Sequence, residues 1–262
     1  MTTFNTPPKV HIIIPARYKS TRLPAKPLLD IHGKPMILWT AQKALQATFA
    51  DSVCVATDDD RIYKVCQSAG VPVVMTGEHA SGTDRLGEVA GLLGFADDDI
   101  VVNMQGDEPL VPPVLLEQVK NLLIENPHCV MATLCEVIDN YDDFYKNSVV
   151  KVVKAGNQAL YFSRSPMPYD RGGHLKDELG ERPKNAYRHL GLYAYRVKLL
   201  KEFGAWEQGE LEVLESLEQL RILENHQKIA IDVATVSLPL GVDTQDDLDR
   251  LNAMPFEEFV KF

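Results

Sequence analysis

The chain has 262 residues, of which 45% are hydrophobic, 8% aromatic and 24% charged, and this composition excludes an intrinsically disordered protein. The length is sufficient for one sizeable hydrophobic core. The formal net charge of −10 argues against a nucleic-acid-binding protein, which needs a basic face, but it allows an anionic substrate held by a few cations in one cleft.

Strands and helices alternate through the first half of the sequence. Apolar runs predict strands and helical apolar spacing predicts helices, in the order 9–14 (strand), 36–48 (helix), 52–57 (strand), 58–69 (helix), 71–75 (strand), 84–93 (helix), 99–104 (strand) and 112–125 (helix). This order indicates an α/β fold with a doubly wound, mostly parallel sheet. Ligands of such sheets bind beyond the carboxyl ends of the strands, which here means after Pro15 and from Gln105 onward.

The second half is less regular. It predicts strands at 130–137, 149–153, 159–163, 189–195 and 229–233, and helices at 211–225 and 244–251. Four leucines are expected to form the core stripe of the longer helix: Leu211, Leu214, Leu217 and Leu220. Thr244 suits the N-cap of the last helix. No repeat or linker divides the chain, so we expect a single domain.

The four cysteines form no C-x-x-C pair, which predicts buried, reduced thiols and no zinc site. The first eight residues lack the basic start and apolar run of a signal peptide. No stretch approaches the roughly 20 apolar residues that a membrane span requires. We therefore expect a cytoplasmic protein with no membrane partner and no nucleic-acid partner.

The common nucleotide motifs are missing, but a basic loop follows the first strand. Neither G-x-G-x-x-G nor G-x-x-x-x-G-K-[ST] is present. Instead, four cations lie within ten residues: Arg17, Lys19, Arg22 and Lys26. Guanidinium and ammonium groups at a strand end suit a triphosphate, although a solvated basic loop is the alternative.

Two aspartates and one small-residue turn are further candidates. Asp107 follows a central strand and Asp243 precedes the last helix, so together they could hold Mg²⁺, which usually takes one or two protein carboxylates plus phosphate oxygens. The alternatives are a turn residue for Asp107 and a helix cap for Asp243. The turn S-G-T-D-R (81–85) allows close approach of a ligand, or it serves only as an N-cap.

These segments, taken in order, resemble one enzyme family. The set is P-A-R-Y-K-S-T-R-L-P-A-K-P-L, S-G-T-D-R, N-M-Q-G-D-E-P, A-L-Y-F-S-R, R-H-L-G-L-Y-A-Y, L-E-S-L-E-Q-L-R and G-V-D-T. Over about residues 9–252 it is similar to the 3-deoxy-manno-octulosonate (Kdo) cytidylyltransferases, which belong to the sugar nucleotidyltransferases. The first motifs would fit many sugar nucleotidyltransferases, whereas R-H-L-G-L-Y and L-E-Q-L-R point to this family.

The resemblance implies a reaction and an assembly. CTP and Kdo would give CMP-Kdo and diphosphate, with Mg²⁺ as cofactor, for lipopolysaccharide biosynthesis. The single domain, 1–262, would carry an inserted β-rich annex at about 135–200 that pairs two subunits into a homodimer.

The resemblance also implies roles for individual residues. The catalytic set would be Arg17, Lys26, Asp107 and Asp243, with the two aspartates holding Mg²⁺. CTP would be bound by Pro15, Ala16, Arg17, Arg22, Lys26, Ser81, Gly82, Arg85 and Gln105. Kdo would be bound by Gln105, Arg164, His189, Tyr193, Glu218 and Gln219. Because Kdo carries a carboxylate, Arg188 is a further cation that could serve its site.

Other functions stay open at this point. The acceptor could instead be 8-amino-Kdo or a sialic acid. A glycosyltransferase usually carries a D-x-D metal motif, but here D-D-D at 58–60 opens a predicted helix and D-D-D at 97–99 precedes a strand. A non-catalytic nucleotide-binding module is the third alternative.

Overall fold

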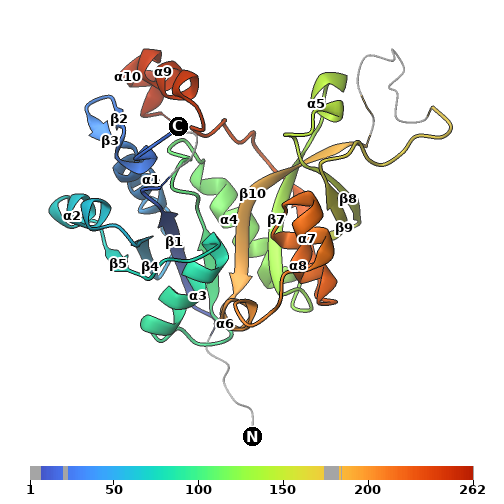
Figure 1. Ribbon diagram of the computed structural model, residues 1–262, viewed down its shortest axis with the longest axis horizontal. Coiled ribbons are helices and arrows are strands. Elements are labelled where there is room, and N and C mark those ends of the chain that lie inside the picture. Colours follow the sequence, from blue (N-terminus) through green and yellow to red (C-terminus); the bar gives the residue numbers. More distant parts are fainter. Residues whose placement is uncertain (1–6, 20–22, 174–182, 184, 262) are drawn as a thin grey trace, which may run out of the picture.

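The computed structural model describes residues 7–19, 23–173, 183 and 185–261. Within these ranges the main sheet has nine strands in the order β5-β4-β1-β6-β10-β7-β11-β9-β8 (Figure 1). The strands are β1 (Val10–Ala16), β4 (Ser52–Thr57), β5 (Val73–Met75), β6 (Ile100–Asn103), β7 (Met131–Val137), β8 (Lys151–Ala155), β9 (Gln158–Ser163), β10 (Tyr187–Arg196) and β11 (Ile229–Val233). A separate short hairpin joins β2 (Asp30–Ile31) to β3 (Lys34–Pro35).

Helices surround the sheet and close its ends. They are α1 (Met36–Ala44), α2 (Asp60–Ser68), α3 (Gly82–Leu92), α4 (Pro113–Glu125), α5 (Tyr141–Tyr145), α6 (Val197–Phe203), α7 (Glu210–Glu215), α8 (Gln219–Glu224), α9 (Gln245–Ala253) and α10 (Phe256–Phe259), with a 3-10 turn, η1, at Lys26–Leu28. Figure 1 shows α9 and α10 beside the β2–β3 hairpin. No helix of the described residues is both long and apolar enough to cross a bilayer.

The N-terminal part of the sheet is parallel and covered on both faces, as predicted. β1 pairs in parallel with β4 and β6, and β5 lies at the edge beside β4. Because side chains alternate across a strand, Ile12 and Ile14 pack in one core with Leu115 of α4, while Ile13 packs in the other core with Leu86 of α3. Each of the three isoleucines is fully buried.

The C-terminal part of the sheet is mixed, which limits the prediction of a mostly parallel sheet to the first half. β10 is antiparallel to both β6 and β7, whereas β11 is parallel to β7. The β8–β9 hairpin and α5 project to one side in Figure 1, in the region of the expected annex. The long strand β10 pairs with β8 near Tyr187 and with β6 near Tyr195, so the annex strands continue the main sheet.

The predicted helix over 211–225 is wrong, because the chain breaks between α7 and α8. Ser216 adopts φ +51°, in the left-handed region that interrupts a right-handed helix. As a result Leu211 and Leu214 are 39% and 79% exposed, and only Leu217 and Leu220 of the predicted stripe are buried.

Smaller expectations about caps and cysteines can also be checked. Thr244 caps α9 by accepting the amide of Asp247, as predicted. The cap of α2 is Asp59 instead of Asp58, because the Asp58 carboxylate pairs with Arg85. All four cysteines are free and buried, as predicted.

Candidate active site

A cleft of about 510 Å³ opens at the carboxyl ends of β1 and β6, where the sequence predicted a site. Its wall combines the exit of β1, the turn before α3, the segment after β6 and the start of α8. The lining residues are Pro15, Ala16, Arg17, Lys19, Lys26, Pro27, Ala80, Ser81, Gly82, Gln105, Gly106, Asp107 and Glu218. Most of the residues predicted for CTP therefore line one cleft.

The segment after β6 lies directly against the exit of β1. A side chain at Gly106 would bring its Cβ to 2.8 Å from the carbonyl oxygen of Pro15, so only glycine allows this approach. Thr40 of α1 donates a hydrogen bond of 3.1 Å to the carbonyl of Gly106 from the other side. This packing fixes Asp107 at the edge of the cleft.

Lys26 joins the two predicted metal-binding aspartates. Its Nζ lies 2.6 Å from Asp107 Oδ2 and 2.8 Å from Asp243 Oδ1. Burial lowers the pKa of Lys26, but the nearby carboxylates outweigh burial and raise that pKa above its ordinary value. The ammonium is therefore charged, and two aspartates 136 positions apart in the sequence converge on one positive charge.

Hydrogen bonds of backbone amides hold the segments of Asp107 and Asp243 together. The amide of Val242 donates to the carbonyl of Asp107 at 2.9 Å, which ties the segment before α9 to the segment after β6. The amide of Asp243 in turn donates to Asp247 Oδ2 at 3.1 Å. Asp243 thus lies just before the N-terminus of α9 without being its cap, since Thr244 has that role.

Glu108 is a site residue that the sequence reasoning missed. Burial, with smaller contributions from the charges of Asp107 and Asp243, raises the pKa of Glu108 to about 8. Its Oε2 is buried and has no hydrogen-bond partner among the described residues. At neutral pH the carboxyl is mostly protonated and adds little negative charge beside the two aspartates. The acidic doublet in Q-G-D-E-P was the available signal.

The two aspartates fit a hard divalent cation. The Lys26 ammonium acts as a stand-in ion that shows how both carboxylates face one cationic position. No group of three His, Cys, Asp or Glu side chains gathers around a common point in the described ranges. Two carboxylates completed by phosphate and water oxygens is the arrangement that Mg²⁺ favours.

The basic loop faces the turn before α3 across the cleft. Arg17 donates to the carbonyl of Ala80 at 3.2 Å, and Lys19 forms an exposed ion pair of 2.7 Å with Glu78. Ser81 accepts the amide of Asp84 at 3.1 Å, so it both caps α3 and lines the cleft. The S-G-T-D-R turn can therefore act as an N-cap and also allow close approach of a ligand.

Among the described residues, one that was predicted to bind CTP, Arg85, does not line the cleft. Arg85 is fully buried, with its guanidinium 2.9 Å from Asp58 Oδ2 and 2.5 Å from Thr76 Oγ1. It faces the protein interior because it lies on the core side of α3, which corrects the prediction of direct contact with the nucleotide. Arg22 lies outside the described residues.

Three of the predicted sugar-binding residues, His189, Tyr193 and Gln219, lie together in the fold. The His189 ring centroid lies 5.4 Å from that of Tyr193, and Gln219 Nε2 lies 3.4 Å from His189 Nδ1. Burial lowers the pKa of His189 to about 3, so the imidazole is neutral. Burial also raises the pKa of Tyr193, with smaller contributions from Tyr195, Glu218 and Glu108.

Arg164 and Glu218, two further residues predicted for the sugar site, lie in different surroundings. Glu218 lines the cleft and accepts a hydrogen bond from Thr83 Oγ1. Arg164 follows β9, and its Nε donates to the carbonyl of Glu215 at 2.8 Å, close to the break between α7 and α8. The structure therefore places Arg164 at the helix break and not in the wall of the nucleotide cleft.

Comparison with known proteins places this chain in a family. Residues 11–229 match the cytidylyltransferase family. The chain belongs to that family. It is 65% identical to the 3-deoxy-manno-octulosonate cytidylyltransferase of a Psychrobacter species, with 96% of this chain and 95% of the relative covered. The corresponding enzyme of Acinetobacter baumannii is 58% identical, with coverage of 95% and 99%.

A solved structure of CMP:2-keto-3-deoxy-manno-octonic acid synthetase complexed with CTP has the same fold as this cytidylyltransferase. The TM-score is 0.85 at 40% sequence identity, and the match covers 94% of this chain and 97% of the other. The α/β nucleotidyltransferase fold predicted from the sequence is thereby confirmed.

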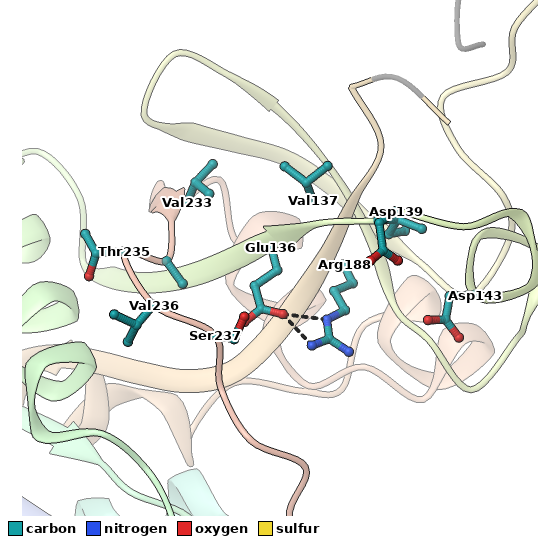
Figure 2. A pocket seen from close by; sticks show the side chains of 11 residues that line it. Glu136, Val137, Asp139, Asp143, Arg188, Val233, Thr235, Val236 and Ser237 are labelled. Carbon is teal, nitrogen blue, oxygen red and sulfur yellow. Dashed lines mark hydrogen bonds and ion pairs between the residues drawn. The ribbon is translucent and has the colours of Figure 1, made fainter. Parts of the chain in front are cut away.

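Arg188 of this cytidylyltransferase lies outside the group around His189. Figure 2 shows it in a second cavity, of about 500 Å³, where it pairs with Glu136. The Nε of Arg188 donates to Glu136 Oε2 at 2.9 Å. Successive residues of a strand point to opposite faces, so Arg188 cannot share a pocket with the adjacent His189. The prediction that Arg188 serves the carboxylate of Kdo together with His189 is therefore wrong.

Proposed function

We propose that this protein transfers the cytidylyl group of CTP to Kdo, giving CMP-Kdo and diphosphate, and so supplies activated Kdo for lipopolysaccharide biosynthesis. The observation that carries the reaction class is Lys26 held between Asp107 and Asp243 at the edge of a strand-end cleft. The choice of CTP and Kdo is supported by the names of the relatives at 65% and 58% identity.

The reaction needs positioning and charge neutralisation more than covalent chemistry. The anomeric hydroxyl of Kdo would attack the α-phosphorus of CTP in line, and diphosphate would leave. Arg17 and Lys26, which line the cleft, would neutralise the phosphate oxygens, an effect that is strong in a site with little water. When bound between Asp107 and Asp243, Mg²⁺ would supply further neutralisation of phosphate charge.

The acceptor side would be formed by Glu218 and the group of His189, Tyr193 and Gln219. Glu218 and Gln219 offer oxygen acceptors for sugar hydroxyls, and Tyr193 offers a hydroxyl donor. Burial raises the pKa of Glu218, while hydrogen bonds from Ser81 and Thr83 oppose that shift. Gln105 lines the cleft near Asp107, where it could contact both substrates.

We further propose that the annex pairs two chains into a homodimer. Several large apolar side chains of this region are exposed in the single chain, namely Val137 (52%), Tyr145 (65%), Leu160 (55%) and Tyr169 (89%). Exposed apolar side chains that gather in one region are typical of a protein–protein interface. We also propose a cytoplasmic location, since the four free, buried cysteines suit a reducing compartment.

The decisive experiment is a diphosphate-release assay with CTP, Kdo and Mg²⁺. Release should require all three components, and Kdo should be used in preference to 8-amino-Kdo and N-acetylneuraminic acid. UTP in place of CTP tests the base. CTP binding without diphosphate release for any of these sugars would instead support a non-catalytic nucleotide-binding module.

A further inference from the structure

Thr133 lies beside the predicted sugar-binding residues, and no motif of the sequence singled it out. It is fully buried in the centre of β7, opposite β10. Its Oγ1 lies 3.0 Å from the carbonyl oxygen of Leu190, 2.9 Å from that of Leu192 and 2.9 Å from His189 Nε2.

A local irregularity in β10 explains why one hydroxyl meets two carbonyls. In the pairing of β10 with β7, Leu190 lies opposite Leu134 and Tyr193 lies opposite Thr133. The residues between Leu190 and Tyr193 therefore have no partner in β7, as in a β-bulge. The carbonyls of Leu190 and Leu192, at this irregularity, both lie within hydrogen-bond distance of the Thr133 hydroxyl, which can donate to them.

The single proton of this hydroxyl decides the state of His189. Carbonyl oxygens only accept, so the Thr133 proton is directed at Leu190 and Leu192. Toward His189, Oγ1 can then only accept, which requires the proton of the imidazole to be on Nε2. Nδ1 is left as an acceptor, because burial lowers the pKa of His189 to about 3 and keeps the ring neutral.

The same logic fixes the amide of Gln219. Its Nε2 lies 3.4 Å from His189 Nδ1, and a nitrogen without a proton can be approached only by the donor end of the amide. The amide oxygen of Gln219, Oε1, is therefore not used by His189, and no donor among the described residues bonds to it.

We infer that Thr133 is a positioning residue that orients Gln219, through the Nε2–H tautomer of His189, so that the Gln219 amide oxygen can accept a hydroxyl of the sugar. This inference rests on the proposed function for the identity of the acceptor. The part that concerns the tautomer does not depend on the substrate.

The test compares Thr133→Val, which removes the hydroxyl at nearly constant volume, with Thr133→Ser, which keeps it. In long-range ¹H–¹⁵N spectra of the labelled protein, with His189 assigned by comparison with His189→Gln, the wild type should show a protonated Nε2 and an unprotonated Nδ1. Thr133→Ser should give the same pattern, and Thr133→Val should lose it.

Kinetics provide the second readout. Thr133→Val should raise the KM for Kdo by about tenfold, the effect of one lost buried hydrogen bond, while the KM for CTP stays within about twofold. Thr133→Ser should restore the KM for Kdo. A loss of kcat with both KM values unchanged, or equal loss in both variants, would overturn the positioning role.

The outcomes separate this inference from the proposed function. A wild type with the proton on Nδ1 would overturn the inference even if CMP-Kdo forms. A wild type that releases no diphosphate from CTP and Kdo would overturn the proposed function, whatever the tautomer. If Thr133→Val does not fold, the wild-type spectrum and the kinetics of Thr133→Ser still decide.

Discussion

At the scale of single residues, Lys26, Asp107 and Asp243 form the most informative contact in the molecule. In the unliganded chain the lysine neutralises both carboxylates. On CTP binding the same ammonium would serve the phosphates, and the carboxylates would be available to a metal ion. The ion pairs of Lys26 therefore keep Asp107 and Asp243 together before a substrate binds.

The first prediction concerns these carboxylates. Asp107→Asn and Asp243→Asn should each lower turnover by at least about a hundredfold, because each removes a carboxylate that would hold the Mg²⁺ neutralising the transferred phosphate. Steady-state diphosphate release at saturating Mg²⁺ measures the effect. Asp246→Asn is the matched control, since Asp246 is exposed on the first turn of α9 and should keep near-normal turnover. Normal turnover in either cleft variant would rule out its metal-binding role.

The second prediction follows from the neutral imidazole of His189. Its pKa is about 3 in the folded chain and about 6.5 when unfolded, so the unfolded chain takes up the proton first as the pH falls. The stabilisation is complete above pH 6.5 and is lost progressively toward pH 3. Between pH 7 and pH 5 the wild type should lose about 2 kcal/mol of unfolding free energy that His189→Gln does not lose.

Urea unfolding at the two pH values measures this difference. His128→Gln is the control, because His128 is exposed and should leave the pH dependence as in the wild type. If the unfolding free energy of His189→Gln depended on pH as strongly as that of the wild type, burial of the neutral His189 ring would not be the source of the pH dependence.

At the scale of elements, the α7–α8 pair determines where two of the predicted sugar-binding residues, Glu218 and Gln219, lie. The two helices meet at Ser216 and are joined by Glu212 and Arg221. Arg221 Nε lies 2.7 Å from Glu212 Oε2, and Arg221 Nη2 lies 2.5 Å from Glu212 Oε1. Their side chains are only 6% and 7% exposed. This buried pair sets the direction of α8, which begins at Gln219.

The third prediction is that Glu212→Gln destabilises the fold by about 3 kcal/mol, because it leaves a buried guanidinium without its counter-charge. Thermal or urea unfolding measures this loss. Glu210→Gln is the control on the same helix. Since Glu210 is exposed, its replacement should change stability by no more than about 0.5 kcal/mol. Equal effects of the two variants would contradict a structural role for the ion pair.

At the scale of the whole molecule, the strands of the predicted annex, β8 and β9, are an extension of the main sheet. β8 and β9 join the sheet through β11 and β10, and β10 reaches from the annex to the central strand β6. A second chain bound at the annex would therefore be coupled to the strand that carries His189 and Tyr193.

The fourth prediction tests the proposed homodimer. Light scattering after size exclusion should give about twice the chain mass of 29.3 kDa. Leu160→Asp, on the exposed side of β9, should shift the mass to that of one chain, because an unpaired charge is costly in an interface. Leu92→Asp is the control, because Leu92 is similarly exposed but lies on α3. A monomeric wild type would contradict the proposal.

Much of the fold and part of the site could be predicted from the sequence. Short apolar runs identify β1, β4 and β6 because parallel strands covered on both faces are apolar throughout. The break at Ser216 could not be predicted, since the leucine spacing on both sides fits one helix and a left-handed serine has no distinct local signal. The location of Arg85 depended on which face of α3 meets the core, which the motif alone does not reveal.

The sequence alone determined the succession of strands and helices in the first half, the basic loop after β1 and the family, because these depend on local pattern and on ordered motifs. Only the tertiary structure decided that Lys26 lies between Asp107 and Asp243, that Arg188 faces away from His189, and that Thr133 meets the bulge in β10. The physical reason is that the contacts of Lys26 and Thr133 join segments far apart in the chain, and that the separation of Arg188 from His189 depends on which face of the sheet each side chain occupies. These arrangements exist only after the sheet has set the register of its strands.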